Sequence, residues 1–240
     1  MPRSPFRTGS PAAAAAGLAS LAVATLTLVG CTPAAPEPLP TAGPSTSARQ
    51  PTSAAGTVTC DYPAAGKPAR PVNPPPSTGV PATGTVKYTV TLEGSPVTLT
   101  LDRSKAPCTV NSFTSLAGQG YFDGTRCHRL VDSGIFILQC GDPTATGSGG
   151  PGYSFADETT GSESYTTGVV AMANSGPNTN GSQFFLVWDD STGLDKTPNY
   201  TIFGTMDTAS RDVVAQLAGE GRDAKSRPNN PAGISKVSKG

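Results

Sequence analysis

Histidine, tryptophan and net charge are what this sequence has least of. It contains one histidine and one tryptophan in 240 residues, and aromatic residues make up 6%. A single histidine leaves no second one for a metal-binding cluster, so we expect no bound metal. The 17 basic and 17 acidic side chains cancel, which argues against a nucleic-acid-binding protein. Glycine and proline are abundant, with 28 and 24 residues, and they favour loops and short strands over long helices.

The N-terminus has the order of segments typical of an export signal. Arg3 and Arg7 precede an alanine- and leucine-rich run, 12–29, which closes on the sequence Leu-Val-Gly-Cys31. This ending resembles a bacterial lipobox, whose cysteine receives a diacylglyceryl group. We therefore predict a signal peptide over 1–30 and a lipidated Cys31 that anchors the protein to the extracytoplasmic face of the cell membrane. The alternatives are an ordinary signal peptide or one membrane span, for which the run of 18 residues is short and rich in alanine.

Residues 31–83 have the composition of a tether. The part from 32 to 83 holds 13 of the 24 prolines and few large apolar residues, so it cannot form a core of its own. A proline-rich chain is stiff and could hold a folded domain away from the lipid. Cys60 is unusual in such a segment and indicates that the segment is pinned to the domain.

The remaining residues, 84–240, predict one folded domain. Apolar and polar residues alternate over 86–92 and 97–101 on either side of a turn at Gly94 and Ser95, which indicates a hairpin. Helices are expected from Pro107 to Gly118 and over about 209–218. Short apolar segments near 127–131, 135–140, 168–173, 183–187, 200–206 and 234–237 bring the count to eight strands. The predicted fold is mainly β, an eight-stranded antiparallel closed barrel capped by two α-helices.

Three stretches hold the residues that suggest a reaction. They read Cys-His-Arg-Leu at 127–130, Phe-Ile-Leu-Gln-Cys-Gly-Asp at 136–142, and Ala-Met-Ala-Asn-Ser-Gly-Pro-Asn-Thr-Asn-Gly-Ser-Gln-Phe-Phe at 171–185. With them the chain resembles the cyclophilin family of peptidyl-prolyl cis–trans isomerases over about 84–238. The family fold is an eight-stranded barrel with two helices. Its reaction is rotation about X–Pro bonds, which is slow without a catalyst because amide resonance resists twisting.

The resemblance implies a site without a cofactor, a metal or a covalent intermediate. Such a site must hold proline in an apolar slot and favour the twisted amide over the planar one. The catalytic residues implied are Arg129, which can donate to the prolyl nitrogen, and Gln139, which can bind the substrate backbone. The substrate-binding residues implied are Phe136, Ile137, Met172, Ala173, Asn174, Gln183, Phe185, Leu194 and Tyr200. The expected partners are proline-containing polypeptides, exported or resident in the envelope.

Two positions depart from the common pattern of the family. Gly193 stands where many members carry a tryptophan, and Tyr200 stands where many carry a histidine. The loop between Arg129 and Phe136 is also about two residues longer. A glycine has neither the indole N–H donor nor the flat apolar wall, so we expect weak binding of cyclosporin. A non-catalytic module that binds proline peptides is the alternative function.

The other polar candidates have simpler interpretations. His128 occupies a position that is structural in the family, so we expect it to be buried and hydrogen-bonded. With Cys31 lipidated, four cysteines remain (Cys60, Cys108, Cys127 and Cys140), and three pairings are open. If Arg129 and Gln139 share a face, strand alternation makes a Cys127–Cys140 bond the least favoured pairing. Cys60 is expected to bond to the domain.

Overall fold

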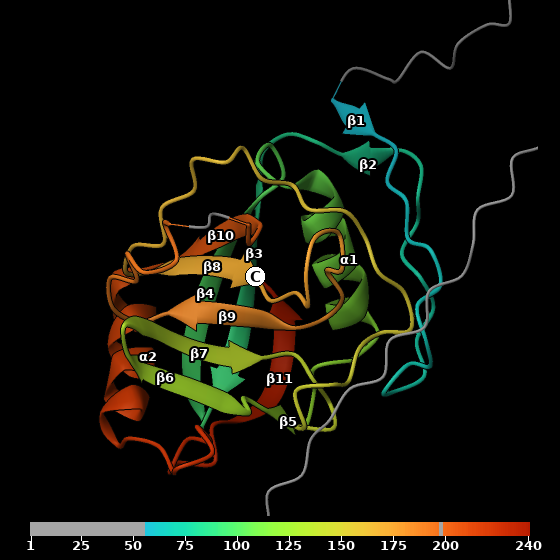
Figure 1. The fold of residues 1–240 in the computed structure, drawn as a ribbon. Coiled ribbons are helices and arrows are strands. Elements are labelled where there is room, and N and C mark those ends of the chain that lie inside the picture. The colour runs from blue at the N-terminus through green and yellow to red at the C-terminus, as the bar shows by residue number, and fades with distance from the viewer. Residues whose placement is uncertain (1–55, 197–198) are drawn as a thin grey trace, which may run out of the picture. The chain divides into compact units, whose positions relative to one another are not determined.

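One curled antiparallel sheet dominates the structure, a computed structural model that describes residues 56–196 and 199–240. Its nine strands follow the order β5-β11-β3-β4-β10-β8-β9-β7-β6 (Figure 1). Their bounds are β3 Thr85–Leu92, β4 Ser95–Asp102, β5 Thr125–Arg126, β6 Arg129–Ser133, β7 Ile135–Cys140, β8 Val169–Met172, β9 Phe184–Val187, β10 Ile202–Met206 and β11 Gly233–Lys239. A separate two-stranded sheet consists of β1 Thr57–Val58 and β2 Val80–Pro81.

The predicted mainly β fold with two helices is confirmed. Eight of the nine strands match the predicted ones, and β5, together with β1 and β2, was missed because two residues carry no periodicity. The sheet curls into a barrel that is not strictly closed. Within the described residues no ladder pairs β5 with β6, and Cys127 and His128 connect these two edge strands along the chain.

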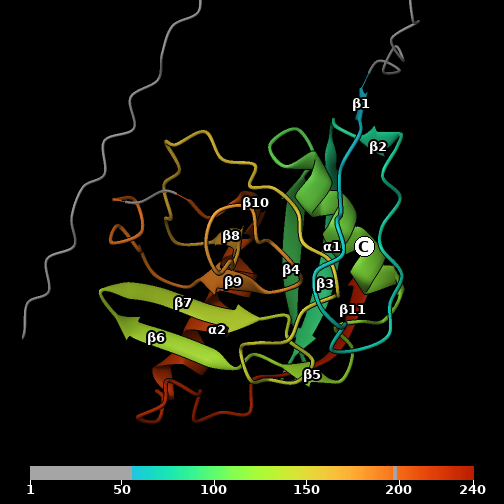
Figure 2. The same ribbon diagram turned by 45° about the vertical axis from the view of Figure 1, so that its right-hand side comes forward.

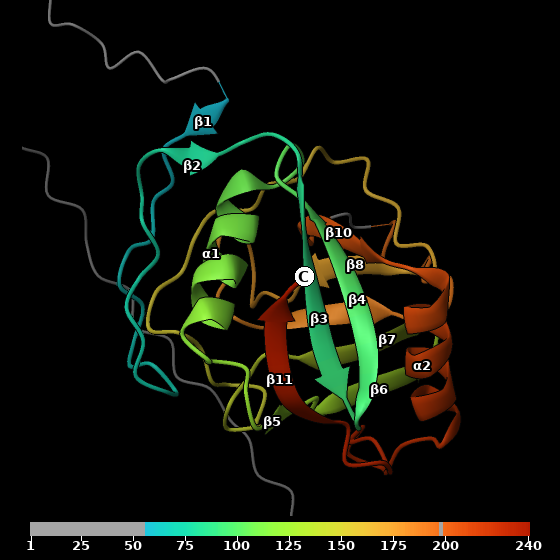
Figure 3. The same ribbon diagram turned by 180° about the vertical axis from the view of Figure 1, so that it is seen from behind.

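Helices α1 (Pro107–Gly118) and α2 (Thr208–Gly219) lie on opposite sides of the β11-β3-β4 part of the sheet (Figure 3). Helix α1 begins with proline at its first turn, and Glu158 accepts hydrogen bonds from its free Cys108 and Thr109 N–H groups at 2.9 and 2.8 Å. The side chain of Asp207 caps α2 by accepting from the Ser210 N–H. Each helix buries one apolar face, with Val110, Phe113 and Leu116 on α1 and Val214 and Leu217 on α2.

Side-chain alternation along the strands produces two separate apolar clusters. Leu138 and Phe184 point into the main core, which lies inside the curled sheet. Their neighbours Ile137 and Phe185 point the other way, as alternation requires. They belong to a smaller cluster on the outer face of β7, β9 and β8, which comprises Ile137, Tyr165, Val169, Ala171, Phe185, Val187 and Leu194. The outer face of this half of the sheet is therefore apolar where water would otherwise be expected.

Residues 60–70, here called the strap, pack on the domain beside α1 (Figure 2). Cys60 forms a disulfide with Cys108, so the prediction that Cys60 bonds to the domain is confirmed. The Tyr62 hydroxyl donates to the Cys108 carbonyl at 2.8 Å, and Arg70 donates to three carbonyls of the turn after α1. The predicted tether extends to residue 83, but three of its residues belong to the core. Cys60 and Tyr62 in the strap are 3% and 9% exposed, and Val80, which lies beyond the strap, is 1% exposed.

The second disulfide joins Cys127 to Cys140, the pairing that the sequence argument ranked last. The prediction assumed that Cys127 lies on the same strand as Arg129. The strand β6 begins at Arg129, however, and Cys127 donates its N–H to the Ala232 carbonyl in the connection from β5. Alternation does not apply across that connection, so Cys127 can turn inward and meet Cys140, which points into the core.

The predicted signal peptide, Cys31 and the tether up to residue 55 lie outside the described residues. Within the described part of the chain, no helix combines the length and the apolar character needed to cross a bilayer.

Replacing both Cys60 and Cys108 by alanine should lower the free energy of unfolding by about 2–4 kcal/mol, because the disulfide restrains the unfolded chain. Urea denaturation of the full chain without reductant measures this loss. The matched control replaces Cys127 and Cys140. These two cysteines are 13 residues apart in the sequence, whereas Cys60 and Cys108 are 48 residues apart. Loop-closure entropy makes the contribution of this shorter closure smaller by about 1 kcal/mol. An unchanged free energy in the first variant would contradict a structural role for the strap.

Candidate active site

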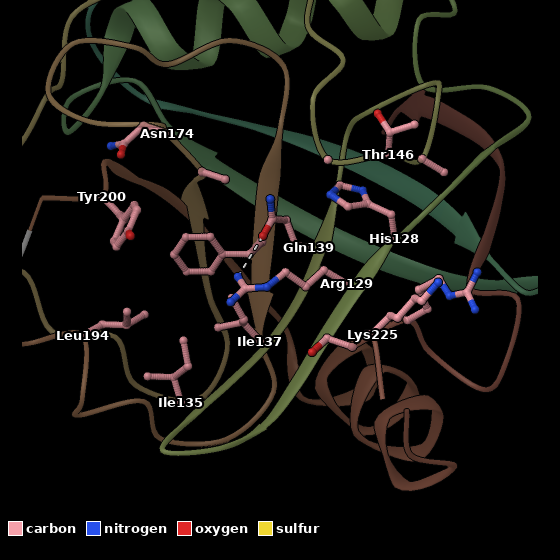
Figure 4. Close-up of a pocket in the computed structure, with 16 residues that line it drawn as sticks. His128, Arg129, Ile135, Ile137, Gln139, Thr146, Asn174, Leu194, Tyr200 and Lys225 are labelled. Carbon is pink, nitrogen blue, oxygen red and sulfur yellow. Dashed lines mark hydrogen bonds between the residues drawn. The ribbon is translucent and has the colours of Figure 1, made fainter. Parts of the chain in front are cut away.

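The outer apolar cluster forms the floor of a pocket of about 580 Å³ (Figure 4). Ile137 from β7 and Phe185 from β9 lie on the same face of two paired strands, where Ile137 is opposite Val187 and Phe185 is opposite Gln139. Leu194 and Tyr200 approach from the segment after β9, and the rings of Tyr200 and Phe185 form a T-shaped pair with centroids 5.6 Å apart. Aromatic and branched side chains in a concave site suit a compact apolar group such as a proline ring.

A chain of hydrogen bonds crosses the rim of this pocket. Arg129 and Gln139 stand directly opposite each other on β6 and β7, and Arg129 Nη1 donates to Gln139 Oε1 at 3.1 Å (Figure 4). Gln139 Nε2 donates in turn to Gln183 Oε1 at 2.9 Å. Gln183 Nε2 then donates to the carbonyls of Gly147 and Gly149 at 3.0 and 2.9 Å. These contacts fix the orientation of both amides, and they leave most of the five guanidinium N–H donors of Arg129 for a ligand.

Asp142 holds the loop that receives this chain. It is 0% exposed and accepts hydrogen bonds from the backbone N–H groups of Thr144, Thr146, Gly147 and Gly149, and from the Thr144 hydroxyl. Burial alone would raise the pKa of Asp142. The donated hydrogen bonds outweigh burial and lower the pKa to about 2. The carboxylate is therefore charged at neutral pH and fixes the Gly147 and Gly149 carbonyls that bind Gln183.

His128 lines the pocket beside this loop, near Thr146 (Figure 4). Its ring is half-buried, and neither ring nitrogen has a hydrogen-bond partner among the described residues. The prediction of a hydrogen-bonded histidine is thus wrong for this structure. Burial lowers the pKa of His128 despite the nearby Asp142 charge, so the ring is neutral at pH 7. The described residues contain no cluster of three or more His, Cys, Asp or Glu side chains that could hold a metal ion.

Most of the residues predicted for the site meet in this pocket. The pocket brings together Arg129, Ile137, Gln139, Ala173, Asn174, Phe185, Leu194 and Tyr200, while Gln183 lines the adjoining hollow. Two predicted residues lie elsewhere. Met172 points into the main core, and Phe136 packs edge-on against Trp188 with ring centroids 5.1 Å apart. Phe136 lies between the pocket residues Ile135 and Ile137, and Met172 directly precedes the pocket residue Ala173. Alternation therefore places both side chains on the opposite face.

Three parts of the pocket wall were not predicted from the sequence. Ile135 lies two residues before Ile137 on β7, so alternation could have identified it. The loop residues Ala145, Thr146 and Gly147 and the later residues Lys225, Ser226 and Arg227 also line the pocket. No sequence pattern marks these two loops, because their positions depend on the Asp142 hydrogen bonds and on the chain after α2.

The comparisons with known proteins agree with this geometry. Residues 85–239 match the family described as "Cyclophilin type peptidyl-prolyl cis-trans isomerase/CLD". The chain belongs to the cyclophilin family.

Among its relatives, "Probable peptidyl-prolyl cis-trans isomerase B" of Mycobacterium leprae is 45% identical over an alignment of 176 residues, and the match covers 67% of this chain and 59% of that protein. The Mycobacterium tuberculosis protein of the same name is 42% identical, over 69% of this chain and 59% of the relative. The chain thus spans about three fifths of the length of these curated relatives.

A solved cyclophilin type isomerase of Cryptosporidium parvum superposes with a TM-score of 0.58 at 28% identity. The match covers 65% of this chain and 98% of that one. The same protein has been crystallised in the presence of the dipeptide Ala-Pro, with a TM-score of 0.57.

Gly193 has a steric explanation in this cyclophilin. A Cβ atom at residue 193 would lie 2.7 Å from the Gly134 carbonyl oxygen and 3.1 Å from Ile135 Cγ2. The turn at Gly134, between β6 and β7, therefore occupies the space next to Gly193. The single tryptophan, Trp188, follows β9 directly and packs against Phe136. Weak binding of cyclosporin stays a prediction, and a tryptophan at 193 would first have to displace the turn.

The variant Asp142→Asn should lose about 2–3 kcal/mol of stability at pH 7, because it removes the charge and replaces one acceptor oxygen by an NH2 group that faces the loop N–H groups. Since the folded pKa lies below the usual value, the contribution of Asp142 is present above about pH 4 and declines as the pH falls through about 2. Urea denaturation as a function of pH should therefore show a flatter acid limb in the variant. Asp61→Asn, at an exposed position, is the control; equal effects of the two changes would contradict the assignment.

Proposed function

We propose that this protein is a peptidyl-prolyl cis–trans isomerase that accelerates rotation about X–Pro bonds without a covalent intermediate. The observation that carries this proposal is the Arg129–Gln139–Gln183 chain at the rim of an apolar pocket, in a member of the cyclophilin family. The supporting geometry pairs one fixed cation with an apolar floor, which is what amide rotation requires.

In the proposed mechanism the proline ring lies on Phe185, between Leu194 and Tyr200. Arg129 donates an N–H to the prolyl nitrogen, where the lone pair becomes available as the amide twists out of conjugation. The barrier to this rotation is about 18–20 kcal/mol because resonance favours the planar amide. A donor that binds the twisted form more strongly than the planar one lowers that barrier. Gln139 acts by orienting Arg129 and, through its amide, the substrate backbone.

No step of this mechanism moves a proton between protein and substrate. Arginine stays protonated at every accessible pH, and His128 is neutral and faces no partner among the described residues. The proposed reaction therefore depends little on pH around neutrality, in contrast to reactions that use a general base.

A binding module without turnover is the second candidate. The altered rim at Gly193 favours it, since this position offers the substrate no side chain. The two candidates differ in a measurable way, because both bind proline peptides but only the isomerase changes the rate of cis–trans exchange.

The setting of the activity is also part of the proposal. We propose that Cys31 is lipidated and that the clients are exported or envelope polypeptides, on the strength of the basic residues, the apolar run and the lipobox-like ending at the N-terminus. Several acyl chains hold a protein on a membrane stably, whereas one chain binds only marginally.

The variant Arg129→Ala should lower kcat/KM for a proline peptide by at least about a hundredfold, the scale for losing one electrostatic donor to the transition state. Its melting temperature should stay close to that of the wild type, because an exposed arginine contributes little to stability. A protease-coupled assay on the full chain measures the turnover. Arg126→Ala, also exposed and three residues earlier, is the control and should keep full activity. Near-full activity of Arg129→Ala would refute the mechanism.

The variant Cys31→Ser should move the protein from the membrane fraction to the soluble fraction and abolish labelling with a palmitate analogue. Fractionation and metabolic labelling of the producing cells measure both effects. Cys60→Ser changes a cysteine that the disulfide holds, so it should leave labelling intact. Equal acylation and membrane binding of Cys31→Ser would reject the anchor.

A further inference from the structure

A second hollow of about 530 Å³ adjoins the first pocket. The two share Gln139, Gly147, Ala173 and Asn174. By the resemblance, Ala173 and Asn174 contact the part of a peptide that precedes proline. A polypeptide whose proline lies on Phe185 would therefore continue, in its N-terminal direction, over these two residues and into the second hollow.

One wall of this hollow comes from the strap, through Ala65, Gly66 and Lys67. This segment lies outside residues 85–239, which match the family. It is held on both sides of Lys67. Ala65 and Ala69 donate their N–H groups to the Gly152 and Gly150 carbonyls at 2.8 Å each. The Cys60–Cys108 disulfide and the Arg70 hydrogen bonds fix its two ends. The position of Lys67 at the hollow is therefore determined by the fold of the strap.

Lys67 is the one charged residue among those that line the second hollow. Its ammonium group has no ion pair within the described residues, and the other lining residues are small or neutral polar ones. The lining of the first pocket likewise contains cations and no carboxylate; of these, Arg227 is paired with Asp223 at 2.6 Å. A carboxylate that enters the second hollow would thus meet the unpaired ammonium group of Lys67, and no negatively charged side chain of the lining would repel it.

We propose that Lys67 makes this protein select polypeptides that carry an acidic side chain two or three residues before the proline. The inference rests on the proposed isomerase function and adds a substrate class to it. An exposed ion pair is typically worth a small factor, so a Glu peptide should exceed its Gln counterpart in kcat/KM by about two- to fivefold at low salt. Added salt should reduce this ratio toward one because it screens the charges.

The test uses the full chain and acetylated, amidated peptides that differ only in Glu, Gln or Lys at the second and third positions before proline. Exchange NMR measures the catalysed cis–trans rate without a protease, and titration gives the Kd of each peptide. Lys67→Gln should bring the Glu/Gln ratio of kcat/KM close to one. Lys67→Glu should lower this ratio below one and make the Lys peptide the preferred substrate. Both variants should retain wild-type turnover of the Gln peptide. Lys239→Gln removes the same charge from an exposed position on β11 and should leave the ratio unchanged.

The outcomes separate the two proposals. A ratio near one in the wild type, with rapid turnover of the Gln peptide, would overturn the role of Lys67 and leave the isomerase function standing. The role of Lys67 would also be overturned if Lys225→Gln, which alters the first pocket, removes the preference while Lys67→Gln does not. Absence of turnover with every peptide would overturn the isomerase function. Tighter binding of the Glu peptide that depends on Lys67 would then still support the selection.

Discussion

The alternation of side chains along β7, β9 and β8 is the constraint on which the rest of this structure depends. Each of these strands faces the main core on one side and the pocket on the other, so neither face can be polar throughout. The inner residues, such as Leu138 and Phe184, stabilise the curled sheet. The outer residues, such as Ile137 and Phe185, are then held rigidly by the same backbone. The pocket floor is thus preorganised by the core, and binding of a ligand requires little ordering of side chains.

The polar part of the site depends on a second element of rigidity, the buried carboxylate of Asp142. It gathers the N–H groups of the loop after β7 and so presents the Gly147 and Gly149 carbonyls to Gln183. Because the hydrogen bonds run in sequence from Arg129 to the loop, the orientation of Arg129 depends on a charge at the far end. The Cys127–Cys140 disulfide adds a covalent link near this chain of hydrogen bonds. Cys140 follows Gln139 on β7, and Cys127 lies two residues before Arg129.

Sequence periodicity predicted eight of the strands and both helices, because these features follow from local patterns, whereas the residues at the centre of the site came from the resemblance to the cyclophilin family. The opposed pair Arg129 and Gln139 combines the two, since a hairpin with known strands brings two such positions together. Motif likeness alone was less accurate than alternation. It assigned Phe136 and Met172 to the pocket, and alternation counted from Gln139 and Ala171 would have excluded them. The reverse error occurred at Cys127, where alternation was applied beyond the start of β6.

Only the attachment of the strap through Cys60 was predicted, and its packing on the domain was missed for a different reason. Its composition argued correctly that it cannot form a core of its own, yet it contributes to the core of the domain through a few anchors. Tyr62 packs edge-on against Tyr153 and Phe155, with ring centroids 5.5 and 5.6 Å apart, and Cys60 is bonded to α1. Proline restricts the unfolded chain, so ordering such a segment costs less conformational entropy than ordering a flexible one. A small number of anchors is then sufficient to hold it. Composition therefore indicates whether a segment can fold alone, and says little about whether another part of the chain will bind it.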